Sequence, residues 1–299
     1  MLIHIKKQRG LIIFWLSMAI SQARNIGLPL MNLVRLKGET ILRQLQLEEQ
    51  LLRTSSDNWF IINDGTNTPT IVMGMSGKPV ELIELESVLR DRVPVIRRFS
   101  GGGTVIVDCG TIFVSFICNK DAVPGLQPYP HPIMSWSGLL YNEVFRGIGD
   151  FHLRENDYVF GNRKFGGNAQ SITKNRWIHH TSFLWDYDAR NMAYLKLPTR
   201  APEYRLVTLL NFTPSEITGS QARGHAEFVC CMKDYLPRSA FIERTVKAVE
   251  THFSVRSMQL EAIGTFPDAT FSHSTKLLTK QELEAFYSLQ FDNSLSESL

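Results

Sequence analysis

Apolar residues recur every three or four positions in residues 39–53, which predicts an amphipathic helix. The same spacing predicts further helices over residues 80–90, 135–148 and 239–253. Short apolar runs bounded by turn residues predict strands over residues 59–64, 70–74, 93–98, 104–108 and 111–118. Residues 156–188 are rich in β-branched and aromatic residues, which predicts another antiparallel pair. Helices interleaved with antiparallel strands favour a single α+β domain over residues 31–290.

Three segments lie outside this pattern. Residues 207–221 are polar and turn-prone, so we expect an inserted surface loop there. Residues 291–299 are expected to be a frayed tail. Residues 1–30 include a ten-residue apolar run that is too short to span a bilayer. They are interpreted as a secretory signal, an organellar leader, or an unused extension before Met31.

The charge of the chain is concentrated at its start. Residues 1–38 hold six basic residues and no acid, which leaves 26 of the 32 basic residues to face 29 acidic ones. The rest of the chain therefore has a net charge of −3, and we expect no nucleic-acid partner. No later segment is long and apolar enough to predict stable membrane insertion.

The cysteines form neither a disulfide framework nor a zinc pattern. The chain has four, Cys109, Cys118, Cys230 and Cys231, and no CxxC pair. We expect ordinary thiols, which argues against a secreted product.

Two glycine-rich motifs carry the candidate chemistry. In "RRFSGGGTVIVD" (residues 97–108) two arginines precede three glycines. The glycines suit a hairpin turn, but they also admit a ligand to the backbone amides, and we expect both roles. In "RKFGGNAQS" (residues 163–171) Lys164 stands beside a second glycine pair, where it can serve as a point charge for phosphate.

Together with "HHTS", these motifs resemble the lipoate-protein ligase A family of the biotin/lipoate ligase superfamily, in its eukaryotic organellar type. The resemblance runs from the helix at 39–53 to about Phe253. It implies a mixed, largely antiparallel sheet flanked by helices, related to class II synthetase-type sheets. It also implies that ATP, with Mg²⁺, activates lipoate to lipoyl-AMP, and that the lipoyl group passes to an acceptor lysine. No metal fixed by the protein is expected.

The resemblance assigns residue roles. Lys164 is the candidate catalytic residue, in contact with phosphate and acyl carbonyl oxygens. Thr104 and Val105 would present backbone to the adenine, and Asn168 and His180 would line the same pocket. The full set of candidate binding residues is Arg97, Arg98, Ser100, Gly101, Gly102, Gly103, Thr104, Val105, Asp108, Asn168 and His180. Adjacent histidines on a strand face opposite ways, so His179 and His180 are not expected to share a metal.

Departures from the family pattern leave alternatives open. Residues 107–111 lack the histidine and asparagine that bacterial members carry there, and we expect no C-terminal accessory domain after the last predicted helix. The protein could transfer lipoyl or octanoyl groups without its own adenylation step. It could also be a biotin-protein ligase or a non-catalytic lipoate-binding relative. A thioester mechanism is disfavoured, because Cys109 is the only thiol near a motif in the sequence.

The resemblance also implies the acceptors. They are the lipoyl domains of 2-oxoacid dehydrogenase E2 subunits and the glycine-cleavage H protein. With the basic leader, these acceptors favour a mitochondrial location, with plastid or cytoplasm as alternatives.

Overall fold

The computed structural model describes residues 27–197, 202–205, 224–263 and 271–296. The insertion predicted at 207–221 and most of the predicted leader lie outside these residues. Within them, no helix has the length and apolar content needed to cross a bilayer.

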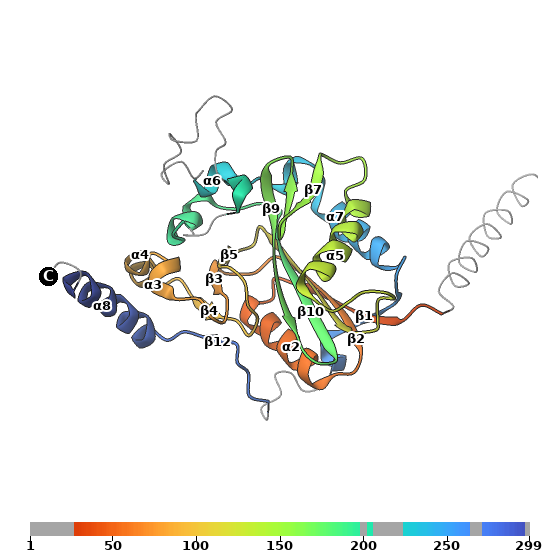
Figure 1. Cartoon of the computed structure of the whole chain (residues 1–299), viewed down its shortest axis with the longest axis horizontal. Coiled ribbons are helices and arrows are strands. Elements are labelled where there is room, and N and C mark those ends of the chain that lie inside the picture. Colours follow the sequence, from red (N-terminus) through yellow and green to blue (C-terminus); the bar gives the residue numbers. More distant parts are fainter. Residues whose placement is uncertain (1–26, 198–201, 206–223, 264–270, 297–299) are drawn as a thin grey trace, which may run out of the picture.

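An eight-stranded sheet forms the centre of the molecule, with strand order β11-β1-β2-β6-β10-β9-β8-β7 (Figure 1). Most neighbours are antiparallel, while β1 runs parallel to both β2 and β11. The bounds are β1 (Leu30–Lys37), β2 (Asn58–Asp64), β6 (Thr111–Asn119), β7 (Phe151–Arg154), β8 (Asp157–Phe160), β9 (Arg163–Ile172), β10 (Arg176–Leu184) and β11 (Ser254–Met258). The predicted mixed, largely antiparallel sheet is therefore confirmed.

A second sheet of four strands, in the order β12-β4-β3-β5, lies beside the first. Its strands are β3 (Thr70–Met73), β4 (Val95–Arg97), β5 (Val105–Val107) and β12 (Lys276–Leu277). The helices are α2 (Ile41–Thr54), α3 (Pro79–Leu82), α4 (Leu85–Asp91), α5 (Pro130–Val144), α6 (His225–Phe228), α7 (Arg238–Val249) and α8 (Lys280–Ser296). Short 3-10 turns are η1 (Ala189–Tyr194), η2 (Glu203–Arg205), η5 (Met232–Asp234) and η6 (Leu260–Ile263).

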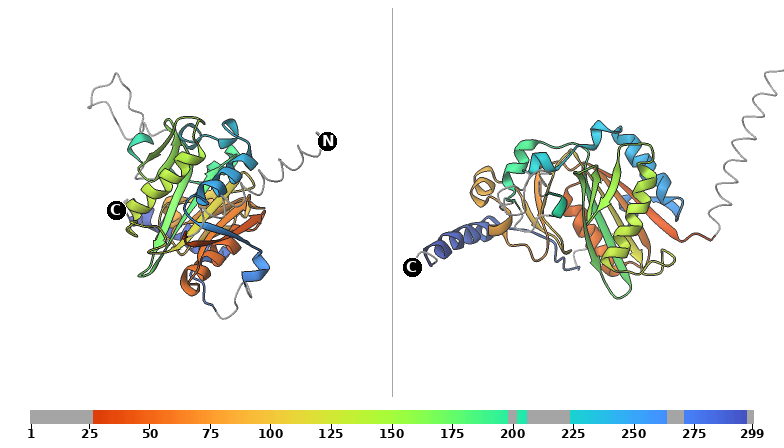
Figure 2. Two further views of the ribbon diagram at one scale, coloured as in Figure 1. Left: turned by 90° about the vertical axis from the view of Figure 1, so that its right-hand side faces the viewer. Right: turned by 45° about the horizontal axis from the view of Figure 1, so that its top comes forward.

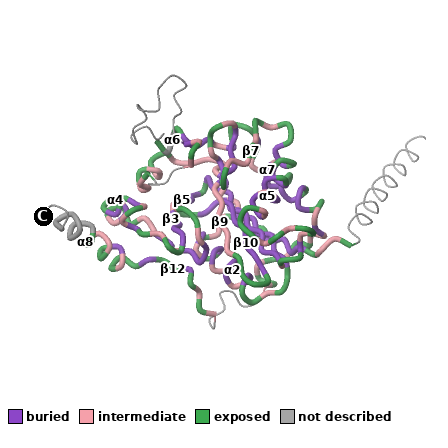
Figure 3. Tube along the Cα trace, viewed as in Figure 1, coloured by how far each residue is buried: buried purple, intermediate pink, exposed green. Residues whose placement is uncertain are grey.

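Alternation along β6 shows how the layers form. Ile112, Val114 and Phe116 face α5 and α7 in the main core, whereas Phe113 faces α2 and the small sheet. Helices α5 and α7 thus cover one face of the large sheet, and α2 with the small sheet covers the other (Figures 1 and 2). Buried residues concentrate along the strands and the inner faces of these helices (Figure 3). The fold class predicted from the sequence, α+β, is correct.

Several boundaries differ from the predictions. Strand β1 begins at Leu30, and Ser254 N–H donates to the Pro29 carbonyl at 2.9 Å, so the domain starts before residue 31. The helix predicted over 80–90 is split, because Ile83 and Glu84 make backbone contacts with Leu195 and Tyr194. Helix α8 continues to Ser296, where a frayed tail was expected from residue 291.

Candidate active site

The glycine loop, residues 98–104, crosses over the end of β3. Its flanking strands β4 and β5 do not pair with each other, because β3 lies between them, so the predicted hairpin is wrong. The crossing brings two backbones into contact: Met75 N–H donates to the Ser100 carbonyl at 3.0 Å. A Cβ atom on Gly74 would lie 2.2 Å from the Gly102 carbonyl oxygen. Gly74 is therefore required for this close approach.

Gly102 places the loop against the strand that carries Lys164. Its φ of +97° favours glycine, and a Cβ there would meet Ala169 Cβ of β9 at 3.2 Å and Arg98 Nη2 at 2.9 Å. A Cβ on Gly101 or Gly103 would meet no atom within 4 Å among the described residues. The two outer glycines are thus not required by packing, which leaves the loop backbone open to a ligand.

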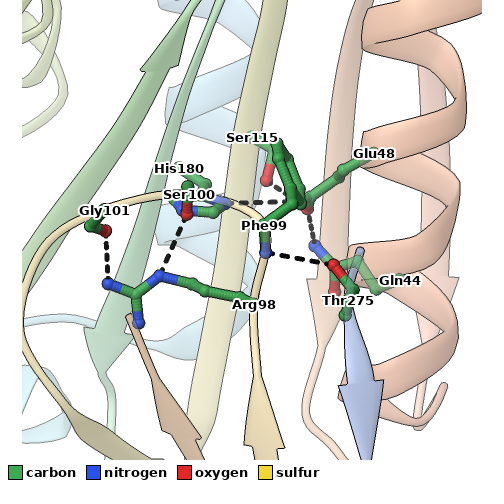
Figure 4. A network of polar contacts seen from close by, with 9 residues as sticks. All are labelled: Gln44, Glu48, Arg98, Phe99, Ser100, Gly101, Ser115, His180 and Thr275. Carbon is green, nitrogen blue, oxygen red and sulfur yellow. Dashed lines mark hydrogen bonds and ion pairs between the residues drawn. The ribbon is translucent and has the colours of Figure 1, made fainter. Parts of the chain in front are cut away.

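A buried chain of hydrogen bonds runs from the loop into the sheet (Figure 4). Arg98 Nε donates to Ser100 Oγ at 3.0 Å, and Ser100 Oγ lies 2.9 Å from His180 Nε2. His180 Nδ1 lies 2.9 Å from the Glu48 carboxylate of α2. These four side chains are each at most 4% exposed. The chain fixes the loop on β10 and α2.

Arg98 acts inside the loop. Its guanidinium also donates to the Gly101 carbonyl at 2.6 Å, and burial lowers its pKa to about 10. Arg98 was predicted as a binding residue, and the structure directs these donors at the loop itself. Arg97 is similar: its Nη1 donates to the Met75 and Gly77 carbonyls at 2.9 and 2.6 Å.

Glu48 was not predicted as a site residue. Its second carboxylate oxygen accepts from Ser115 Oγ at 2.5 Å and from Gln44 Nε2 at 2.8 Å. Burying a carboxylate is costly unless it is hydrogen-bonded, and these donors satisfy it. The available signal was an acidic residue inside the apolar stripe of a predicted helix.

Lys164 lies on the same face of the large sheet as His180, with a carboxylate as its partner. Its Nζ contacts Asp157 Oδ1 of β8 at 2.8 Å, and Tyr204 donates to Asp157 Oδ2 at 2.6 Å. A Cβ on Gly167 would lie 3.2 Å from Lys164 Nζ, so this glycine leaves room for the lysine side chain. Asp157 was also missed, since no pattern in the sequence pairs it with Lys164.

The remaining predicted residues divide between the site and the scaffold. Thr104 Oγ1 is buried and has no hydrogen-bond partner among the described residues, and half-buried Val105 follows it at the start of β5. Asp108 accepts from Gly110 N–H at 2.8 Å and from Asn191 Nδ2 at 3.0 Å, so its carboxylate closes a turn.

Asn168 does not line the face that carries Lys164. Its side chain accepts from Thr181 Oγ1 at 2.5 Å and donates to the Asn156 carbonyl at 2.9 Å, on the opposite face of β9. The expectation that Asn168 and His180 share one pocket is therefore wrong for the Asn168 side chain. Only its carbonyl approaches the glycine loop, 3.7 Å from a Cβ placed on Gly102.

The two histidines of β10 point in opposite directions, as predicted. His180 joins the loop network, whereas His179 is buried in the other core, with Nε2 at 3.3 Å from Tyr158 Oη. Burial lowers the pKa of His179 to about 3, and the neighbouring His180 adds to the effect. Among the described residues, no three His, Cys, Asp or Glu side chains are placed to hold a metal ion.

A cysteine lies beside Lys164 in space, contrary to the expectation that only Cys109 is near a motif. Cys230 N–H donates to the Lys164 carbonyl at 2.9 Å, and the residue is 3% exposed. Burial raises the pKa of Cys230 to about 11, so its thiol stays protonated at neutral pH. Cys230 is thus a poor nucleophile.

Known proteins resemble the chain in both sequence and structure. Residues 40–254 match the family model of the lipoyl protein ligase A/B catalytic domain. "Inactive lipoate--protein ligase 2" of Plasmodium falciparum is 25% identical over 270 residues, covering 70% of this chain and 66% of that protein. A "Probable lipoate-protein ligase A" of Mycoplasma genitalium is 29% identical over 205 residues, covering 67% of this chain and 56% of that protein. The chain thus spans between about half and two thirds of the length of these relatives.

Solved structures share the fold at low sequence identity. A lipoate-protein ligase A crystallised with ATP has a TM-score of 0.59 at 15% identity, covering 89% of this chain and 94% of that one. The bipartite lipoate protein ligase of Thermoplasma acidophilum, studied with its E2 lipoyl domain, has a TM-score of 0.58 at 18% identity, covering 88% and 92%.

Proposed function

Because the chain belongs to the lipoyl protein ligase A/B catalytic domain family, we propose that it activates lipoate with ATP and attaches it to a lysine of a lipoyl domain. One observation carries the proposal: the open glycine loop rests on β9, the strand that presents Lys164. Loop amides and a lysine on one face of a sheet suit a ligand that holds both a phosphate and an acyl group.

The chemistry has two steps. The lipoate carboxylate attacks the α-phosphate of ATP, which forms lipoyl-AMP and releases pyrophosphate. The acceptor amine then attacks the acyl carbonyl, and AMP leaves. Lys164 stabilises the negative charge that builds on the acyl and phosphate oxygens, and the loop amides position the adenylate.

Mg²⁺ is proposed to enter with ATP. Proteins commonly bind this ion through one or two carboxylates together with substrate phosphates. Asp157 is not free for this role, because its two carboxylate oxygens already contact Lys164 Nζ at 2.8 Å and Tyr204 Oη at 2.6 Å. The ion is therefore proposed to be held by the substrate phosphates. When bound, the ion would neutralise phosphate charge.

The raised pKa values of two thiols favour adenylate chemistry over a thioester route. Burial raises the pKa of Cys230, the thiol next to Lys164, and also that of Cys231. A cysteine nucleophile requires the opposite shift.

Transfer from a preformed adenylate, use of biotin, and binding without catalysis are the competing outcomes of the test below.

We propose lipoyl domains of 2-oxoacid dehydrogenase E2 subunits and the glycine-cleavage H protein as acceptors. The archaeal relative's study with an E2 lipoyl domain supports the first of these. Such acceptors, together with the basic first 38 residues, support a mitochondrial location. Imaging of the tagged full-length chain tests it.

The function is tested by mass spectrometry of an apo lipoyl domain incubated with the protein, ATP, Mg²⁺ and lipoate. We expect the mass gain of one lipoyl group. A gain only with supplied lipoyl-AMP would reduce the protein to a transferase. A gain with biotin alone would change the substrate, and no gain in any reaction would leave a non-catalytic relative.

Lys164→Ala is expected to slow transfer about 100- to 1,000-fold, the usual loss when one charge-stabilising donor is removed. The measurement is the initial rate of lipoyl-domain modification, with circular dichroism to confirm the fold. Lys174→Ala is the control, because Lys174 is exposed at the turn between β9 and β10. Equal rates in the two variants would remove Lys164 from the mechanism.

A further inference from the structure

A segment outside the matched catalytic region reaches the glycine loop. The family match ends at residue 254, and residues 271–278 form an extended segment along the small sheet. Within it, Lys276 and Leu277 of β12 pair with Arg97 and Ile96 of β4. Leu278 N–H continues the pairing to the Val95 carbonyl at 2.8 Å. Residues 274–278, which we call the strap, therefore add the edge strand β12 beside β4. Strand β4 is the strand from which the glycine loop continues.

Helix α2 anchors the start of the strap through Glu49. The Glu49 side chain is fully buried, and its carboxylate accepts from Ser274 N–H at 3.0 Å and from Thr275 N–H at 2.9 Å. Arg53 completes the site with an ion pair of 2.9 Å. Burial acts to raise the pKa of Glu49, but the hydrogen bonds from Thr275 and Ser274 outweigh it, and the pKa is lowered. The anchor therefore favours the charged carboxylate.

Thr275 connects this anchor to the loop. Its hydroxyl accepts from the Phe99 backbone N–H at 3.2 Å, and Thr275 is 2% exposed (Figure 4). Phe99 lies between Arg98 and Ser100, the two loop residues held by the His180 network. The loop is thus fixed from two sides, by β10 through Ser100 and by the strap through Phe99. A buried N–H that loses its acceptor destabilises the conformation that requires it.

We propose that Thr275, held by Glu49, is a positioning residue that keeps the glycine loop in its ligand-binding conformation. The catalytic consequence rests on the proposed function, whereas the effect on the loop does not. A loop that is competent for only part of the time raises the apparent Kd by the inverse of that fraction. Loss of the strap contact should therefore raise KM for ATP and lipoate and leave kcat nearly unchanged.

The test uses the full chain with Thr275→Val, which keeps the side-chain shape and removes the acceptor. We expect amide hydrogen exchange in residues 98–104 to become about tenfold faster, and KM to rise by at most the same factor, because KM depends only on the fraction of closed loop that remains. Thr275→Ser retains the hydroxyl and should restore both values. Thr245→Val is the matched control, because Thr245 is also buried and hydrogen-bonded, but to Phe241 within α7.

Hydrogen exchange decides the proposal even if the protein proves not to be a ligase. Unchanged exchange in residues 98–104 of Thr275→Val, relative to Thr245→Val, would overturn it. A fall in kcat with constant KM would also overturn it, since that would place Thr275 in the chemical step. If the wild-type chain proves inactive but Thr275→Val still exchanges faster than the wild type, the positioning role of Thr275 is supported and only the ligase function is refuted.

Discussion

At the scale of single residues, the adjacent histidines of β10, His179 and His180, have different surroundings. His180 lies among polar groups and holds Ser100 of the glycine loop, whereas His179 is buried between Tyr158 and Gln170. Desolvation disfavours the charged imidazolium, which is why the pKa of His179 falls to about 3. The main core therefore contains an imidazole that lowers the stability of the folded state when the solution is acidified.

The sign of this effect follows from linkage. The folded-state pKa of His179 lies below the unfolded value of 6.5, so the unfolded state takes up the proton first. The part of the free energy of unfolding that depends on His179 is therefore fully present above pH 6.5 and is lost as the pH falls toward 3. Between pH 7 and 5, His179 should lower the free energy of unfolding by about 2 kcal/mol.

This prediction is checked by urea unfolding at pH 7 and pH 5. In His179→Gln the difference between the two pH values should shrink by about 2 kcal/mol. His131→Gln is the control, since His131 is exposed at the start of α5. Equal pH differences in the wild type and His179→Gln would contradict the assignment.

The structure brings some of the predicted site residues together and separates others, for a physical reason. Gly102 and Lys164 could be predicted because a glycine run and a glycine-flanked lysine are local signals. Glu48 could not, because its partner His180 lies 132 residues further along the chain. Asp157 could not, because its contact with Lys164 arises only when β8 pairs with β9. Asn168 was placed on the wrong face, since a register shift between β8 and β9 breaks the count of alternating positions before it.

At the scale of elements, the small sheet depends on the C-terminal helix. Helix α8 packs Leu283 against the cluster that contains Ile71, Val88 and Ile106. Periodicity predicted α2, α5 and α7 but not α8, because the apolar residues in the α8 sequence do not recur along one face. The two residues of β12 are also too few to form a recognisable strand pattern.

Leu283→Ala should lower the free energy of unfolding by about 2–3 kcal/mol, because Leu283 is 5% exposed and the change leaves a cavity. The same helix offers a control in Leu289, which is 53% exposed. Leu289→Ala should stay within about 0.5 kcal/mol of the wild type. Urea titration measures both, and equal losses would show that α8 does not dock through Leu283.

At the scale of the whole molecule, the large and the small sheet both pack on helix α2, but they differ in how far they are shielded from local opening. Strands β6 and β10 lie in the middle of the large sheet, with cores on both faces. The small sheet has short strands, and its glycine loop is open at Gly101 and Gly103. The glycine loop thus belongs to the less protected half, which suits the ligand-binding role proposed for it.

We expect the two sheets to open with different free energies. In native-state hydrogen exchange, amides of β3 and β4 should exchange at least about tenfold faster than those of β6 and β10. Mass spectrometry of peptides from each strand measures this difference. Equal exchange throughout would mean that both sheets unfold as one cooperative unit.

The surroundings of Lys164 have a consequence for residues 206–223. The chain approaches this segment through Tyr204, which holds Asp157, and leaves it through Cys230, which is bound to the Lys164 backbone. Both contacts lie outside the segment itself. We therefore expect a change in the length of the connection between Tyr204 and Cys230 to leave the position of Lys164 unaltered.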